Sequence, residues 1–315
     1  MAKNAPPGNY PEALTERRLS GKVVFACLVQ NDGTASNLRV LGATHVDFVL
    51  PALSALTRWE FTPAQQGDLA VSSELRTAVS FDTIATSRSE VLAANAITSP
   101  DGTAPLAPPL PQNAVDPVWP HELLMKGEGG SASVEFTVDL RGQVTGVKVR
   151  EATHPAFGHA LAAAMEQWTF NPAMDGGRTI AVPLVKHAEF KAEPLLGDSG
   201  GVDQPRAHLL QMARAGTIPG GAGLDEKLVP LYRVAPVYPA ALRSGTRPKG
   251  EAVIEFVIDQ EGRARLPCIM SASQEEFGWA AATAVSQWVF KAPLRAGKPT
   301  EVKVQIPFVF SPPEI

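Results

Sequence analysis

The segment Gly197–Gly201 reads Gly-Asp-Ser-Gly-Gly, which has the form of a serine-nucleophile motif. A working serine site also needs a histidine base, a buried aspartate that orients this histidine, and backbone N–H groups that hold the oxyanion. Here Val202 follows the motif instead of proline, and no Ala-Ala-His-Cys phrase precedes it. A turn rich in glycine and serine is the ordinary explanation of such a segment, so we assign Ser199 no catalytic role.

The histidines do not have the spacing of a metal site. Zinc needs three or four converging ligands, and the sequence has neither an HxxxH nor an HExxH pattern. His45 and His154 each stand 14 residues before a tryptophan, but Gln274 takes the matching place later in the chain. We interpret the histidines as polar loop residues. The full set is His45, His121, His154, His159, His187 and His208.

The remaining chemical signals are weak as well. Cys27 and Cys268 lie far apart and form neither a disulfide framework nor a CxxC metal site. The run Gly220–Gly223 lacks the Gly-Lys-Ser/Thr that would make it a phosphate-binding loop. We therefore predict no catalytic residue, no metal site and no cofactor.

Composition narrows the class of protein. The chain has 315 residues, 44% of them hydrophobic and 19% charged, which is typical of a folded globular protein. A net charge of −4 without a basic block argues against nucleic-acid binding. No apolar run reaches the roughly 20 residues of a membrane span, and the first residues do not look like a signal peptide. The protein is thus either cytosolic, or an export segment or anchor has been removed from it.

Three phrases of the form Trp-x-Phe reveal an internal repeat. Each has a glycine 26 residues before the tryptophan, a phenylalanine 11 residues before it and another phenylalanine 22 residues after it. Such matched offsets in three segments define three copies of one module. The landmarks are Trp59, Trp168 and Trp288; Gly33, Gly142 and Gly262; Phe48, Phe157 and Phe277; and Phe81, Phe190 and Phe310.

The pattern within each copy predicts an α+β module. An aromatic-Pro pair opens a short helix, two strands with alternating apolar residues follow around a glycine-bearing turn, and an apolar stripe at helical spacing marks a longer helix. A closing strand ends at the last phenylalanine. We therefore expect helix-strand-strand-helix-strand, with two helices on a three-stranded antiparallel sheet.

The expected organisation is three modules and two connections. The modules span 1–84, 113–194 and 229–315. The segment 85–112 is predicted to be a proline-rich extended linker, and 195–228 a second linker with a short helix near Gln204–Arg214. Because a module of this size is only marginally stable alone, we expect the modules to pack on one another or on their linkers.

The spaced words resemble the C-terminal domain of the TonB energy-transducer family. They are Ala235–Leu242 with Trp288–Phe290, Asp116–Pro120 with Trp168–Pro172, and Asn9–Pro11 with Trp59–Pro63. In that family the domain is periplasmic, and it adds an extended peptide of an outer-membrane receptor to the edge of its sheet. The resemblance implies a non-enzymatic envelope protein that binds a protein or an extended peptide. The alternative is a component of TonB-dependent energy transduction that lacks its anchor here.

If the closing strand is the docking edge, the resemblance places partner contacts on Thr77, Ala78 and Val79 in copy one. The matching residues in copy two are Lys186, His187 and Ala188. In copy three Pro307 stands where Ala78 and His187 stand, and proline cannot donate a backbone hydrogen bond. We expect copies one and two to accept a strand more completely than copy three. Alternatively, Pro307 only protects this edge from aggregation.

Overall fold

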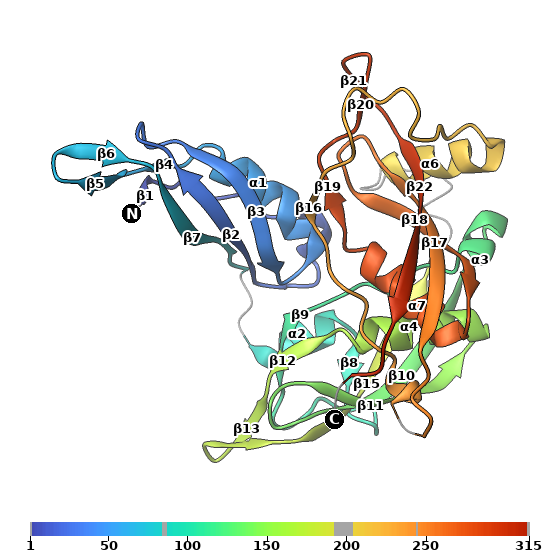
Figure 1. Ribbon diagram of the computed structural model, residues 1–315. Helices are drawn as coiled ribbons and strands as arrows, with labels where there is room; N and C mark the ends of the chain where they lie inside the picture. The colour runs from blue at the N-terminus through green and yellow to red at the C-terminus, as the bar shows by residue number, and fades with distance from the viewer. Residues whose placement is uncertain (1, 84–86, 192–203, 244, 314–315) are drawn as a thin grey trace. The chain divides into compact units, whose positions relative to one another are not determined.

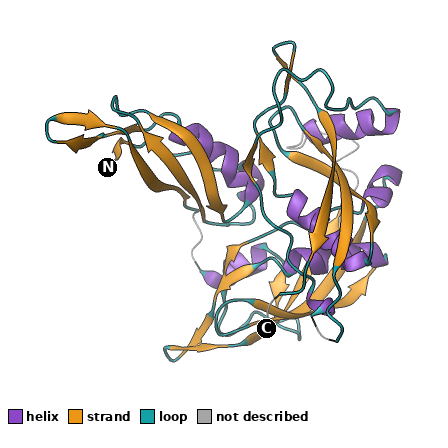
Figure 2. Cartoon of the chain, viewed as in Figure 1, coloured by secondary structure: helices purple, strands orange, loops and turns teal. Residues whose placement is uncertain are grey.

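The structure, a computed structural model, describes residues 2–83, 87–191, 204–243 and 245–313. The chain divides into two compact units, Met1–Ser87 and Arg88–Ile315. Unit 1 contains copy one, and unit 2 contains copies two and three. Figure 1 shows the elements along the chain, and Figure 2 shows helices and strands in each unit.

Copy one is built on a three-stranded antiparallel sheet in the order β3-β2-β7. A single 3-10 turn, η1, stands in place of the expected first helix. The long helix α1 begins just after a second such turn, η2. The elements are β1 (Ala2–Asn4), η1 (Glu12–Leu14), β2 (Gly21–Val29), β3 (Ala35–Ala43), η2 (Val46–Phe48), α1 (Val49–Leu56), β4 (Glu60–Phe61), β5 (Ala64–Gln66), β6 (Leu69–Val71) and β7 (Ser73–Phe81).

Copy two repeats this order, with a sheet β11-β10-β15 that gains a fourth strand, β8. Its first helix, α3, is a true α-helix that ends at Gly127 with a left-handed φ of 73°. The elements are α2 (Arg88–Ala94), β8 (Ile97–Thr98), β9 (Leu110–Asn113), α3 (His121–Lys126), β10 (Gly130–Val138), β11 (Val144–Ala152), α4 (Pro155–Met165), β12 (Thr169–Asn171), β13 (Ala173–Asp175), β14 (Arg178–Ile180) and β15 (Val182–Phe190).

Copy three has the sheet β18-β17-β22, again with a 3-10 turn, η3, as its first helix. The expected helix near Gln204–Arg214 is present as α6. The elements are α6 (Gln204–Ala215), β16 (Pro230–Tyr232), η3 (Ala240–Leu242), β17 (Gly250–Ile258), β18 (Ala264–Ala272), α7 (Glu275–Val285), β19 (Val289–Phe290), β20 (Leu294–Arg295), β21 (Lys298–Pro299) and β22 (Val302–Phe310). The α+β fold with three repeated sheets is thus confirmed.

The landmark phenylalanines form the centre of each core. The phenylalanine at the start of the long helix lies against the one that ends the closing strand, with ring centroids 4.7 Å apart for Phe48 and Phe81. The corresponding distances are 4.4 Å for Phe157–Phe190 and 4.5 Å for Phe277–Phe310. Burying such rings contributes on the order of 2–3 kcal/mol each. The constant spacing of these phenylalanines in the sequence therefore reflects a contact between helix and closing strand that occurs in all three copies.

The turn glycines bring the first hairpin against the Trp-x-Phe strand. Gly142 has a φ of 79°, a region that other residues enter at a cost. Its carbonyl accepts a 2.8 Å hydrogen bond from the N–H of Phe170. A Cβ on Gly142 would lie 1.8 Å from the carbonyl oxygen of Phe170. Gly33 and Gly262 make the same contact with Phe61 and Phe290.

Each landmark tryptophan makes a hydrogen bond to the chain that enters its copy. The indole N–H donates to a backbone carbonyl 53 or 54 residues earlier: Trp59 to Pro6 at 2.9 Å, Trp168 to Val115 at 2.8 Å and Trp288 to Val234 at 2.9 Å. Beside this bond, a short strand preceding the aromatic-Pro pair joins the Trp-x-Phe strand, as β1-β4, β12-β9 and β16-β19. The sequence pattern did not predict these strands.

The segment 85–112 differs from the expected extended linker. It contains α2, β8 and the start of β9. These elements form because the apolar side chains of Val91, Leu92 and Ile97 are buried, each with an exposure of 3% or less. Asn95 closes the helix by donating from its side chain to the carbonyl of Val91 at 2.8 Å. The prolines of this segment follow these buried residues and do not prevent them from packing.

Copies two and three pack on each other within unit 2. Helices α4 and α7 lie side by side (Figure 1). At their ends, the buried amides of the repeat-equivalent residues Gln167 and Gln287 are joined by a 2.7 Å hydrogen bond. The carboxylate of Glu166 accepts a 3.0 Å hydrogen bond from the N–H of Ala240, at the start of η3.

Gly142→Ala tests the close approach of the hairpin. We expect it to lower the free energy of unfolding of unit 2 by about 3 kcal/mol or more, because a positive φ and a backbone overlap add. Gly176→Ala is the matched control, since Gly176 also has a positive φ but has open space around it; we expect a cost of about 1–2 kcal/mol. Urea unfolding followed by tryptophan fluorescence measures both, and equal costs would contradict the account.

Glu166→Gln tests the polar contact between copies two and three. Burial raises the pKa of the Glu166 carboxyl, against the opposing effect of the Ala240 N–H. The folded unit then holds the proton more tightly than the unfolded chain, so its stability falls as pH rises from the ordinary carboxyl range through the raised pKa. Glutamine keeps the acceptor without the charge, so we expect it to reduce this fall. Urea unfolding between pH 4 and pH 7 measures it, with the exposed Glu151→Gln as control; an unchanged slope would refute it.

Candidate peptide-docking edges

The closing strands β7, β15 and β22 each pair along their whole length with the central strand of their sheet. In an antiparallel pair, alternate residues direct both backbone groups toward the neighbour, and the residues between them direct theirs outward. In β15 the N–H of His187 points away from the central strand β10, as its hydrogen bond to the carbonyl of Ala96 shows. The repeat-equivalent residues Ala78 and Pro307 therefore also face outward.

Copy two already carries a strand on this edge. Strand β8 pairs antiparallel with β15, with Thr98 opposite Val185 and Ile97 opposite Lys186. The N–H of His187 donates to the carbonyl of Ala96 at 2.9 Å. Two of the three residues expected to meet a partner in copy two are thus engaged by the chain itself. Copies one and two were both expected to accept a strand more completely than copy three, and in copy two this part of the edge is paired with β8.

Copy three lacks the donor that copy two uses. Pro307 lies opposite Val253 in an unbroken register between β17 and β22, as expected of an outward-facing proline. At the other end of the edge, the N–H of Lys303 donates to the carbonyl of Pro219 at 2.8 Å. The outward row of β22 is therefore interrupted at one position and used at another.

Copy one has the most open edge. Among the described residues of unit 1, β7 pairs with β2 alone. Ala78 is exposed, Thr77 is half-buried and Val79 is buried on the core side. Ala78 thus has a small side chain and an outward N–H, and the neighbouring Val79 anchors the strand in the core. The residues expected to bind a partner strand thus lie together in copy one.

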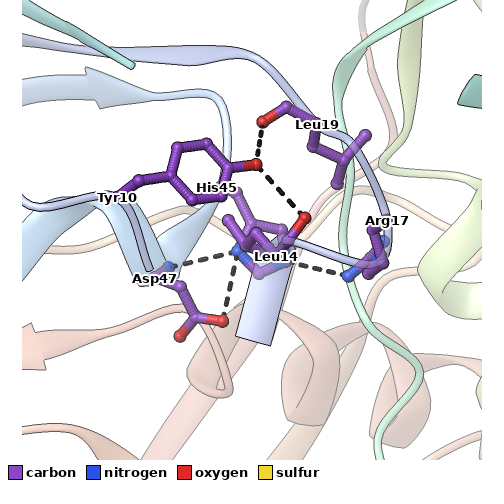
Figure 3. A network of polar contacts seen from close by, with 6 residues as sticks. All are labelled: Tyr10, Leu14, Arg17, Leu19, His45 and Asp47. Atoms are coloured by element: carbon purple, nitrogen blue, oxygen red, sulfur yellow. Dashed lines mark hydrogen bonds and ion pairs between the residues drawn. The ribbon is translucent and has the colours of Figure 1, made fainter. Parts of the chain in front are cut away.

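The histidines shared by copies one and two are helix caps. The Nδ1 atom of His45 accepts from the N–H of Asp47 at 3.1 Å, and that of His154 accepts from the N–H of Ala156 at 3.2 Å. Figure 3 shows the cap in copy one, where the guanidinium of Arg17 lies 3.3 Å from Nε2 of His45. Both histidines stand just before the apolar stripe of the long helix, which is the place of an N-cap residue. The interpretation of the histidines as polar loop residues missed this role.

Tyr10 closes the same region of copy one (Figure 3). Its hydroxyl donates to the carbonyl of Leu19 at 2.6 Å and lies 3.2 Å from that of Leu14. Tyr238 repeats the contact in copy three with the carbonyl of Pro248 at 2.7 Å. The aromatic of the aromatic-Pro pair therefore holds the first turn against the entry to the sheet.

The candidate chemical residues do not form a site in the part of the chain that the structure describes. Ser199 lies outside those residues. Within them, no group of three or more His, Cys, Asp or Glu side chains could hold a metal ion. Burial raises the pKa of the thiols of Cys27 and Cys268, which disfavours the reactive thiolate. No described helix is long and apolar enough to cross a membrane.

The fold defines a class: small α+β domains in tandem, each with a closing strand paired to the central strand of a three-stranded antiparallel sheet. The chain matches the family of the Gram-negative bacterial TonB protein C-terminal over residues 6–83, 115–192 and 234–312. These segments make up most of the chain, and it belongs to this family, with three tandem copies. The expected resemblance is confirmed.

One solved structure of a TonB C-terminal domain is similar to part of this chain. The solution NMR structure of the Pseudomonas aeruginosa TonB C-terminal domain is similar at 28% identity over 26% of this chain and 85% of that chain, with a TM-score of 0.24. No curated protein matches the chain.

Hydrogen exchange distinguishes the edges of copies one and two. We expect the amide of His187 to exchange slowly, since it is bonded to Ala96, and the amide of Ala78 to exchange quickly. Thr77 faces β2 and serves as a protected control within β7. NMR or peptide-resolved mass spectrometry of the full chain provides the rates. Equal protection of Ala78 and His187 would show that the two edges do not differ as described.

Proposed function

We propose that this protein is a non-enzymatic binding protein of the Gram-negative cell envelope that takes up an extended segment of a partner protein at the β7 edge of copy one. Binding occurs by strand addition: the backbone of the partner pairs with the outward groups of β7. The protein acts in the periplasm as a carrier or scaffold for its partner.

The pairing of β8 with β15 is the observation that carries this proposal. It is an antiparallel strand on the same edge of the same fold, joined through the position equivalent to Ala78. An edge that accepts a strand from its own chain has the backbone geometry to accept one from another protein. Membership of a Gram-negative family supports the location.

Magnitudes fit a weak, reversible interaction. Each backbone hydrogen bond contributes roughly 0.5–1.5 kcal/mol net, and β7 offers only a few, because only every second residue of the strand directs its backbone groups outward. Ordering an extended peptide costs part of this gain. Selectivity must then come from the side chains that flank the added strand, which include Arg76 and Ser80 on the exposed face.

Ala78→Pro tests the proposal because copy three carries proline at the same position without disruption of its sheet. We expect the substitution to leave the fold intact and to weaken binding of extended peptides from outer-membrane receptors at least tenfold. Ala78→Ser keeps the N–H and should bind like the unaltered chain. Titrations of labelled peptides followed by amide shifts measure both. Shifts confined to the hairpin tips, or unchanged binding by Ala78→Pro, would argue against edge pairing.

A further inference from the structure

The outer face of the copy-one sheet, opposite α1, carries a groove of about 470 Å³. It opens where β3 bulges away from β2, at the register shift between Ala26 and Leu28. Asn37, at the bulge, has a left-handed φ of 51°. We call this the copy-one groove. Its lining residues are Ala26, Cys27, Leu28, Asn37, Leu38, Arg39 and Glu74.

Copy three has the same groove at the equivalent place, but there it is filled. The repeat offset carries Ala26, Cys27, Leu28, Asn37 and Glu74 onto Glu255, Phe256, Val257, Leu266 and Lys303. All five of these residues line a much smaller cavity of about 90 Å³. Its other walls come from outside the sheet: His121 and Met125 of α3, Ala213 and Gly216 at the end of α6, and Ile218.

Helix α3, the end of α6 and the chain after α6 close the groove of copy three. Ala213 near the end of α6 and Gly216 just after it line the cavity, and Leu209 and Leu210, earlier in the helix, are buried to 1% exposure. Beyond the helix, the carbonyl of Pro219 accepts from the N–H of Lys303 on β22. The groove of copy three is thus covered by residues of α3 and the end of α6 and by the short segment that follows α6.

The cover over the copy-three groove changes the exposure of residues at equivalent repeat positions in copies one and three. Val257 and Leu266 are 4% and 6% exposed under this cover. Their equivalents Leu28 and Asn37 are half-buried and exposed. Every residue lining the copy-one groove belongs to β2, β3 or β7. Copy one therefore presents a preformed receptor for the element that copy three receives from its own chain.

We propose that the copy-one groove binds an amphipathic helix of a partner protein. The helix presents small and aliphatic residues to Ala26, Leu28 and Leu38, and the segment after it offers a carbonyl to the N–H of Glu74, as Pro219 does to Lys303. The guanidinium of Arg39 lies at the exposed rim and favours a carboxylate on the partner helix. The helix occupies the face of the sheet, and only the segment after it reaches the β7 edge, at Glu74, on the same row as Ala78.

The sequence of α6 supplies a probe. A labelled peptide of residues 207–221 is titrated onto the full chain, whose own copy-three groove is already filled. We expect saturable binding, at least tenfold weaker in Leu28→Asp and in Ala26→Trp, which charge and fill the groove. Ser80→Asp is the control on the same exposed face outside the groove and should bind like the unaltered chain, as should Ala78→Pro.

Two results would overturn the proposal. One is the absence of binding up to millimolar peptide. The other is equal binding by both groove variants, each shown by circular dichroism to keep the fold. Loss of peptide binding in Ala78→Pro would also contradict it, because that outcome places the peptide along the edge at Ala78 and not in the groove. Failure of this titration leaves strand addition at β7 untouched, since the two sites are altered by different substitutions.

Discussion

In each copy one hydrogen bond, from the landmark indole to a carbonyl of the chain that enters the module, fixes how the two ends of the module meet. It joins segments more than fifty residues apart and brings the entry strand beside the Trp-x-Phe strand. The tryptophan thereby connects the start of the module to the end of the long helix. The carbonyl of the turn glycine accepts a hydrogen bond from the phenylalanine of the same Trp-x-Phe strand. With this frame fixed, the closing strand can lie at the sheet edge and keep its outer groups available.

The same frame is used three times with different outcomes at the edge. The edge in copy two is covered by β8, the edge in copy three is interrupted by Pro307, and the edge in copy one pairs only inward among the described residues of unit 1. The differences come from the segments between the modules and from single residues, not from the fold. Repetition has therefore produced modules that are alike in their cores and unlike in what their surfaces can bind.

The core could be predicted from the sequence because each landmark has a local physical cause. Gly142 needs its positive φ, Phe157 and Phe190 meet across helix and strand, and Trp168 fills the core, so their spacing is fixed. The short entry strands could not be predicted, since three or four residues carry no periodicity. Strand β8 was missed because proline-rich composition concealed Ile97, whose burial depends on a distant partner. The helix caps at His45 and His154 were missed because the usual N-cap residues are Ser, Thr, Asp and Asn, and histidine is not one of them.

The central claim is that the outward N–H of Ala78 in copy one hydrogen-bonds to the backbone of a partner strand. Scalar coupling across a hydrogen bond reports such a contact directly, between the amide nitrogen of Ala78 and a carbonyl carbon of a ¹³C-labelled bound peptide. The account predicts a resolved coupling at Ala78 and none at Thr77. A peptide that saturates the protein and shows no coupling at Ala78 would contradict it.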